Sequence, residues 1–389
     1  MTIYRDEVLL RLCYAGMMCV AIGTSLIPVY LTTLSEAMGG LAEGQMGLMA
    51  GLLYAGFVSG ILLSGPLADR LGAKPFCLAG AGFSAAGLIL LADAFSFPTL
   101  LAACFVTGFG AGVIDMVMSP IVSALSVSHR AAALNRLHAF YCAGALTTLL
   151  IASLLIRLDV NWRVVMIGFA AAPALVLAGF AVEPVPPLVS GSKKRLRLRQ
   201  LARIPLFYAG LIGILLIGAT EEGMAQWLPA YAERELGFSK AAAGLGLGGF
   251  ALAMGSGRLL ASGYGRNLPG RLMMVGGALL CSAGFAAGAA LGASAPGVAL
   301  GACVLVGLGC SVLWPTALAM AAEAFPQGGA TLFAAMSAAG NAGCLLAPYI
   351  CGLLAEQIGL RAALGLGAAY PLLLVVFLMF GDRMGFARR

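Results

Sequence analysis

Long apolar runs, separated by short polar or Gly/Pro-rich stretches, dominate the hydrophobic pattern of this chain. Each run is about 20 residues long, the length that an α-helix needs to cross the hydrocarbon core of a bilayer. Barrel strands would be half as long and would alternate apolar with polar side chains. Breaking the sequence at the polar stretches predicts twelve membrane helices, over residues 9–33, 44–67, 75–93, 97–125, 134–157, 162–182, 205–232, 239–263, 271–292, 297–323, 329–355 and 360–381.

Composition agrees with a helical membrane bundle. The 389 residues are 61% hydrophobic and 10% charged, whereas a soluble domain is about 25% charged. The first run, Leu9 to Leu31, is too long for the core of a signal peptide and lacks a small-residue cleavage site. All ten cysteines lie in apolar runs without a C-x-x-C pair, which favours small buried hydrophobes over disulfides or metal ligands. We therefore expect an all-α membrane protein without a metal site.

The longest polar stretch divides the chain into two related halves. We expect a six-helix bundle over residues 1–182, a basic linker over 183–204 and a second six-helix bundle over 205–389. "SGILLSGPLADRLGAK" from Ser59 aligns with "SGRLLASGYGRNLPGR" from Ser256, and "GFGAGVID" from Gly108 aligns with "GLGCSVLW" from Gly307. The offsets, 197 and 199 residues, are nearly constant. This is typical of a duplicated unit in parallel orientation, as many secondary transporters have.

Basic residues predict the orientation in the membrane. Of the 23 lysines and arginines, 18 lie in the tails and the even-numbered turns between the predicted helices. The positive-inside rule therefore places both termini in the cytoplasm and the chain in the inner membrane. The net charge of +7 needs no nucleic-acid partner.

The turn between the second and third helices carries a recognisable motif, "GPLADRLGAKP" over residues 65–75. It resembles the G-x-L-a-D-R-x-G-x-K signature of the major facilitator superfamily, and an ordinary charged turn is the alternative. The resemblance implies a conformational latch rather than a solute site. Glycine permits close helix approach, the aspartate meets a helix N-terminus or an arginine, and the cations face anionic lipid. The latch residues are Gly65, Asp69, Arg70, Gly72 and Lys74.

Two further stretches are similar to the fucose/glucose/galactose:proton symporter branch of that superfamily. "GFGAGVIDMVMSPIVSAL" and "LNRLHAFYCAGAL" match its helices four and five, so Asp115 corresponds to the branch's helix-four acid and Tyr141 to its helix-five aromatic residue. Ser119 stands where the branch has asparagine, and the first helix lacks the acid of its known sugar symporters. The branch's helix seven reads E-x5-W-x3-Y, which Glu221, Trp227 and Tyr231 reproduce. Residues four apart share a helix face, and a face of aromatic rings and a hydroxyl suits a sugar.

Two glutamates lie in the middle of the seventh predicted helix. A carboxylate at mid-membrane is costly, about 2.5–3.5 kcal/mol on insertion scales, so it tends to be protonated or to face a wet cavity. Glu221 and Glu222 point about 100° apart, and we assign Glu221 to the solute face and Glu222 to a neighbouring helix. Gln226, one turn after Glu222, is placed to hydrogen-bond it. Buried carboxyls that only fix helix packing remain the alternative for Asp115, Glu221 and Glu222.

These residues define a candidate site for a solute and protons. Proton coupling is assigned to Asp115, Glu221 and Glu222, with Asp115 as the main proton carrier because no other acid interrupts its helix. The repeat adds Trp314, which aligns with Asp115, and Asn341, which aligns with Cys142 next to Tyr141; helix-to-helix bonding is an equal alternative for Asn341. The solute-binding set is Trp227, Gln226, Tyr231, Tyr141, Asn341, Trp314 and Ser119.

The sequence favours a secondary transporter of a sugar or similar small polar solute, driven by protons through alternating access. A proton-driven exporter of drugs or metabolites is the first alternative, and a non-transporting membrane sensor is the second. Neither a nucleotide-binding motif nor a nucleophile with its base is present, so we expect no ATP-driven pump, no enzyme and no cofactor. Expected partners are the solute, protons and membrane lipid, with the protein acting as a monomer.

Overall fold

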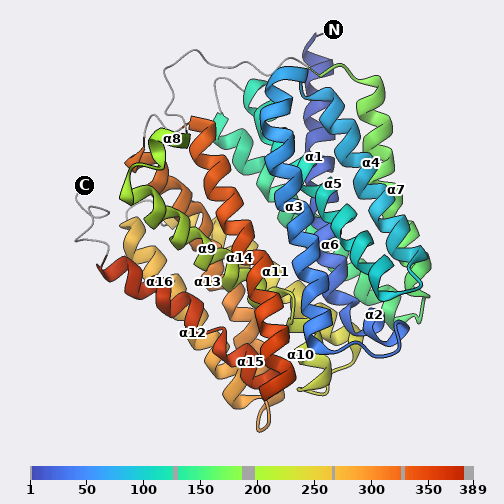
Figure 1. The fold of residues 1–389 in the computed structure, drawn as a ribbon, viewed down its shortest axis with the longest axis vertical. Helices are drawn as coiled ribbons and strands as arrows, with labels where there is room; N and C mark the ends of the chain where they lie inside the picture. The colour runs from blue at the N-terminus through green and yellow to red at the C-terminus, as the bar shows by residue number, and fades with distance from the viewer. Residues whose placement is uncertain (1, 126–129, 186–197, 265–267, 326–328, 381–389) are drawn as a thin grey trace. The chain divides into compact units, whose positions relative to one another are not determined.

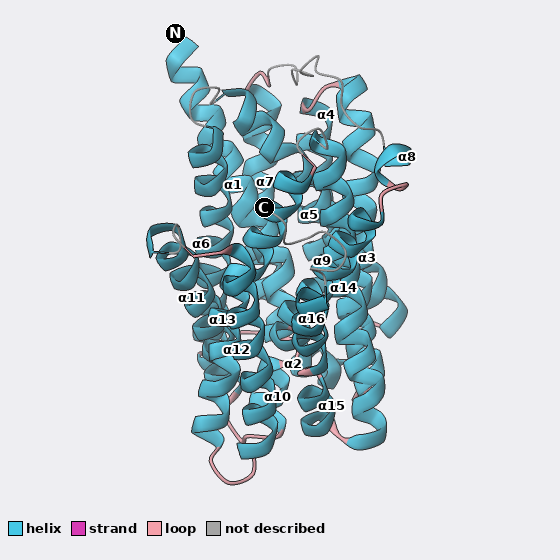
Figure 2. Ribbon diagram, turned by 90° about the vertical axis from the view of Figure 1, so that its left-hand side faces the viewer, coloured by secondary structure: helices cyan, strands magenta, loops and turns pink. Residues whose placement is uncertain are grey.

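The computed structural model describes residues 2–125, 130–185, 198–264, 268–325 and 329–380. Within these ranges the chain consists of α-helices and connecting loops, with no β-strand (Figure 2). Eleven of the described helical segments are long and apolar enough to cross a membrane. The remaining predicted helix, the eighth in order (239–263), is also helical, but several glycines and an arginine lower its hydropathy. The all-α membrane fold predicted from the apolar runs is confirmed.

Sixteen helices are numbered in Figure 1. The first seven are α1 (Thr2–Val29), α2 (Leu31–Ala37), α3 (Glu43–Leu71), α4 (Lys74–Asp93), α5 (Phe97–Leu125), α6 (Arg130–Arg157) and α7 (Trp162–Val182). The remaining nine are α8 (Leu198–Leu201), α9 (Pro205–Ala225), α10 (Leu228–Arg234), α11 (Lys240–Tyr264), α12 (Gly270–Leu291), α13 (Pro296–Ala324), α14 (Gly329–Ile358), α15 (Leu360–Leu366) and α16 (Ala369–Phe380).

Three of the predicted helices are interrupted rather than continuous. The segments 9–33, 205–232 and 360–381 each divide into two helices. Proline explains two of these breaks, because it has no N–H to donate to the carbonyl four residues earlier. Because of Pro229, the Ala225 carbonyl lacks its helical hydrogen bond, and α9 ends at Ala225. Because of Pro371, the Gly367 carbonyl lacks its helical hydrogen bond, and Gly367 directly follows α15. A hydrophobicity pattern does not register a lost hydrogen bond, so these breaks were not predicted.

The chain divides into two compact units. One contains residues 1–41 and 52–192, and the other contains residues 42–51 and 193–389. Residues 42–51, the first turns of α3, therefore group with the second unit. There the Gly44 N–H donates to Glu356 Oε1 over 2.8 Å, and Glu43 pairs with Arg234 at 3.3 Å. The bundle boundaries expected from the sequence stay a prediction, and residues 42–51 lie inside the first expected bundle.

Equivalent glycines make equivalent helix contacts in the two units. In unit 1, a Cβ on Gly108 of α5 would overlap the carbonyl oxygen of Leu53 on α3. In unit 2, a Cβ on Gly307 of α13 would overlap the carbonyl oxygen of Phe250 on α11. Leu53 and Phe250 are 197 residues apart, and Gly108 and Gly307 are 199 apart, which are the two offsets of the sequence repeat. The aligned segments therefore pack in the same way, as a duplicated unit requires.

A second pair of glycines extends this equivalence. Gly110 of α5 lies against Ser84 of α4, and Gly309 of α13 lies against Cys281 of α12. Ser84 and Cys281 are again 197 residues apart. Because glycine has no side chain, the two helix backbones approach closely. In a membrane the hydrophobic effect does not hold helices together, so this close van der Waals packing stabilises the pair.

Helices α4 and α7 cap each other's C-terminal ends in unit 1. At one end, Lys74 Nζ donates to the carbonyls of Ala181 and Glu183, both over 3.0 Å. At the other end, the Arg163 guanidinium donates to the carbonyls of Ala92 and, over 2.9 Å, Ala94. The last carbonyls of a helix have no partner within it and carry partial negative charge, so a cation satisfies both needs. The two antiparallel helices, side by side in Figure 1, are thus fastened at both ends.

Replacing Arg163 by methionine should lower the melting temperature of the detergent-purified protein. The change leaves two helix-end carbonyls without a charged donor, and hydrogen bonds to charged groups contribute about 1.5–3 kcal/mol each. Arg157→Met is the matched control, because Arg157 is an exposed residue at the end of α6. Equal melting temperatures for the two variants would show that the Arg163 contacts do not stabilise the fold.

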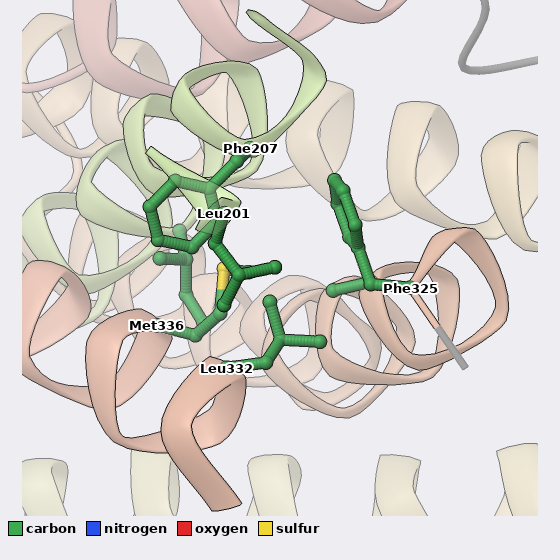
Figure 3. Close-up of a cluster of buried hydrophobic side chains, with 7 residues drawn as sticks. Leu201, Phe207, Phe325, Leu332 and Met336 are labelled. Atoms are coloured by element: carbon green, nitrogen blue, oxygen red, sulfur yellow. The ribbon is translucent and has the colours of Figure 1, made fainter. Parts of the chain in front are cut away.

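A hydrophobic cluster holds the end of the linker against unit 2. Leu201 of α8 is fully buried beneath Phe207 of α9, next to Leu332 and Met336 of α14 and Phe325 after α13 (Figure 3). The rings of Phe207 and Phe325 meet edge to face, with centroids 6.3 Å apart. The last residues of the expected basic linker, 183–204, are therefore anchored by apolar contacts. Residues 186–197 lie outside the described residues.

Candidate functional site

The two consecutive glutamates of α9 have different surroundings in unit 2. Glu222 is 9% exposed, and its Oε2 accepts a hydrogen bond from Gln226 Nε2 over 2.9 Å. Glu221 is only half-buried within the protein. The hydrogen bond predicted from the four-residue spacing is confirmed. The expectation that the two side chains occupy different environments also agrees with the structure.

Glu221 has a basic partner on another helix of unit 2. Arg258 of α11 interacts electrostatically with Glu221, and Cys310 of α13 lies within electrostatic reach of both. The neighbouring Gly257 explains how α11 comes so near, because a Cβ there would overlap Ser311 on α13. An acid, a cation and a thiol from three helices thus interact electrostatically in unit 2. The positive-inside rule considers only which loop a charge is near in the sequence, so it cannot predict an interaction between charges on two different helices.

The two aromatic residues expected at the solute face form structural hydrogen bonds. Trp227 and Tyr231 have no exposed surface. Trp227 Nε1 donates to the Pro348 carbonyl over 3.0 Å, and the Tyr231 hydroxyl donates to the Gly288 carbonyl over 2.7 Å. In this conformation both rings pack the inside of unit 2, so any contact with a solute requires a rearrangement around α10.

The residues that the repeat suggested lie on α13 and α14. Trp314 is half-buried, and its ring occupies the space where a side chain on Gly340 would lie. Asn341, the next residue, is 8% exposed and donates from Nδ2 to the Ser337 carbonyl over 2.9 Å. Trp314 and the turn containing Asn341 therefore lie together, and the amide is partly used by its own helix.

The candidates of unit 1 lie on neighbouring helices. Asp115 and Ser119 are both half-buried on α5. Asp115 interacts electrostatically with His138 of α6. The Tyr141 hydroxyl, also on α6, is 3.2 Å from Thr24 Oγ1 of α1. Three helices of this unit thus contribute polar side chains.

The latch motif spans the end of α3 and the start of α4. A Cβ on Gly65 would lie 3.2 Å from the Met116 side chain, so this glycine allows close approach to α5. Gly72 ends α3 with φ of +82°, a conformation that favours glycine. Lys74 was expected to face lipid, but it is instead bonded to the end of α7. The side chains of Asp69 and Arg70 lie outside the described residues.

An open pocket of about 700 Å³ lies in unit 2, between α12 and the start of α15. It is bordered by Glu235 and Arg361, which form an ion pair at 3.2 Å, and by alanines of α12. None of the predicted site residues lines it. Among the described residues, no group of three or more His, Cys, Asp or Glu side chains is placed to hold a metal ion.

Curated relatives are mostly uncharacterized transporters. Two uncharacterized MFS-type transporters of Mycobacterium tuberculosis are 30% identical over 138 residues, which is 36% of this chain and 33% of theirs. The chain thus matches about a third of these relatives' length. An uncharacterized MFS-type transporter of Yersinia pestis is 24% identical over 86% of both chains. A multidrug resistance protein of Klebsiella pneumoniae is 32% identical over 26% of both.

Solved transporter structures have the same fold. A D-xylose-proton symporter superposes with a TM-score of 0.77 at 16% identity, covering 96% of both chains. A mutant nucleoside transporter gives 0.78 at 15% identity, covering 98% of this chain and all of the other. At such identities the likeness establishes the fold alone. The sequence itself matches the Major Facilitator Superfamily over residues 13–279 and 228–385. This chain therefore belongs to the Major Facilitator Superfamily and is a multi-pass membrane transporter, not an enzyme.

Proposed function

We propose that this protein moves a small polar solute, with a sugar as the preferred class, together with protons by alternating access. The observation that carries the proposal is a set of three ionisable side chains on α9 and α11. Glu221, Glu222 and Arg258 lie in or beside a segment that is apolar enough to span the membrane. Charged side chains are rare at such depth and mark pathways for ions or substrates. Asp115 and His138 form a similar pair in unit 1.

The solute contacts are proposed from polar side chains near these acids. Gln226, Asn341 and Trp314 offer an amide acceptor, an amide donor and a ring in unit 2, while Ser119 and Tyr141 offer hydroxyls in unit 1. Hydroxyl-rich solutes need such groups because a buried polar atom without a partner is unfavourable. Trp227 and Tyr231 support this set by fixing α10 and join it only if α10 rearranges. The sugar–proton and nucleoside transporters with this fold agree with a small polar solute.

The remaining assignments accompany this proposal. The bundles of residues 1–182 and 205–389 alternate access around the site, and Gly65, Asp69, Arg70, Gly72 and Lys74 act as the latch. The excess of basic residues in one set of loops supports an inner-membrane location with both termini in the cytoplasm. We further propose that the transporter works as a monomer.

Proton-driven export is the second candidate function. The partial identity with the multidrug resistance protein supports it, and the same carboxyls would serve an exchange of solute for protons. The two candidates differ in direction, because a symporter moves solute along the inward proton gradient whereas an antiporter moves it against that gradient.

Transport into proteoliposomes tests both candidates. Vesicles with an alkaline interior should accumulate labelled D-xylose, D-glucose or uridine. A gradient of one pH unit stores about 1.4 kcal/mol per proton, which supports about a tenfold concentration ratio for one proton per solute. Protein-free liposomes are the control. If uptake of drug-like cations into acidic vesicles is accelerated instead, export replaces symport; equilibration of a sugar without any response to pH removes proton coupling.

A further inference from the structure

The acceptor atom of a buried amide in unit 2 has no hydrogen-bond partner. Gln226 is 2% exposed, its Nε2 donates to Glu222, and its Oε1 is buried without a bond. Buried polar atoms are nearly always paired, and each of the six exceptions among the described side chains needs a physical reason. Gln226 also lies at the interruption between α9 and α10.

The protonation state of Glu222 decides which end of the amide faces it. An ionised carboxylate only accepts hydrogen bonds, so the amide must present its NH₂ and turn Oε1 away. A protonated carboxyl carries an O–H, and the amide can then rotate by half a turn and accept a hydrogen bond from that O–H with Oε1. The oxygen and the NH₂ group are nearly the same size, so both orientations fit the same space. After the rotation the NH₂ points where Oε1 pointed before.

We propose that Glu222 and Gln226 form a hydrogen-bond switch that converts proton binding into a change from acceptor to donor at one buried position. The inference rests on the proposed proton-coupled function and identifies the residues that link proton binding to solute binding. With Glu222 ionised, the position offers an acceptor. With Glu222 protonated, it offers a donor, which binds a solute atom that has lone pairs but no hydrogen, such as the ring or carbonyl oxygen of a sugar. Proton and solute then bind cooperatively, as symport requires.

The proton balance of the switch is simple. A proton from the aqueous phase that faces the site forms an O–H bond on the Glu222 carboxyl. It returns to water on the other side when the site reopens, and no other covalent bond changes. Rotation of the Gln226 amide only exchanges one hydrogen bond for another.

Titratable groups of neighbouring helices lie near this part of α9. Cys344 of α14 lies within electrostatic reach of Glu222, and Tyr370 of α16 borders the next residue of α9. Arg258 and Cys310, from α11 and α13, act on Glu221. Glu221 lies on the same helix, and Cys344 is within electrostatic reach of it as well. Arg258 thus interacts with Glu221, and the Gln226 amide hydrogen-bonds Glu222.

Infrared difference spectroscopy on the reconstituted protein tests the switch with protons as the only probe. A step from alkaline to acidic pH should produce a carboxyl C=O band together with a shift of a glutamine amide band. Glu222→Gln should remove this carboxyl band and the amide shift together. Gln226→Leu should keep the carboxyl band but move it to higher frequency, because the hydrogen bond to the amide is lost. Glu221→Gln is the matched control and should keep the Glu222 and Gln226 signals.

Two outcomes would overturn the proposal: a carboxyl band at the same frequency in Gln226→Leu, or protonation of Glu222 without any amide shift. If Gln226→Leu does not fold, Gln226→Met, which has a similar length but no amide, replaces it with the same expectation. The experiment contains no solute and no transport step. A failed switch therefore leaves proton-driven uptake to be judged separately, and failed uptake in proteoliposomes leaves the infrared result standing.

Discussion

Replacing Gly108 by alanine should sharply destabilise the protein, although only one methyl group is added. The new Cβ would overlap the Leu53 carbonyl oxygen, so α5 and α3 would have to move apart along their whole contact. Gly56 and Gly112, in the same seam, meet the carbonyls of Phe105 and Phe57 in the same way. Backbone atoms cannot rotate away as side chains do, and overpacking costs about 1–3 kcal/mol, with larger losses at rigid contacts. Thermal denaturation in detergent, followed by size-exclusion chromatography, measures the loss.

Gly82→Ala provides the matched control. Gly82 lies in the middle of α4, and a Cβ there would meet nothing within 4 Å. Alanine favours the helix over glycine by about 1 kcal/mol, so this variant should be as stable as the parent or more so. Gly307→Ala, the repeat equivalent of Gly108→Ala, should behave like it in unit 2. A Gly108→Ala protein that melts with the Gly82→Ala protein would refute the close packing of α3 and α5.

Periodicity and length made most of the fold predictable. A helix that crosses a membrane must satisfy its backbone internally, so a long apolar run leaves few alternatives. The repeat was also readable, because the glycines at 108 and 307 permit the same backbone contact in both units. The bond between Glu222 and Gln226 followed from helix geometry alone, since it joins residues one turn apart on a single element.

Interactions between elements were beyond the reach of the sequence. Arg258 carries a charge near the end of its helix, and only the packing of α9, α11 and α13 brings it to Glu221. Trp227 and Tyr231 have the spacing of a solute-facing pair, yet their polar atoms bond to carbonyls of α14 and α12. Lys74 and Arg163 cap partner helices for the same reason. Each of these partners is distant in sequence, so no local pattern identifies it.

Asp115→Asn should abolish accumulation of solute against its gradient while leaving exchange of labelled for unlabelled solute. Asparagine has nearly the same size and shape as aspartate, but its amide does not take up or release a proton near neutral pH. In the proposed mechanism the half-buried carboxyl on α5, with His138 nearby, carries the proton that couples to transport. Without it, solute still crosses, but the pH gradient no longer drives it.

The two halves of this expectation are measured on the same vesicles. Accumulation of labelled sugar under an imposed pH gradient should fall by about tenfold, to the equilibrium level, since one pH unit supports about that ratio. Counterflow without a gradient should continue. Asp93→Asn, the same substitution at an exposed position at the end of α4, should leave both unchanged. Accumulation by Asp115→Asn at the level of the parent would transfer the coupling to the α9 glutamates, whereas loss of counterflow as well would make Asp115 part of the solute site.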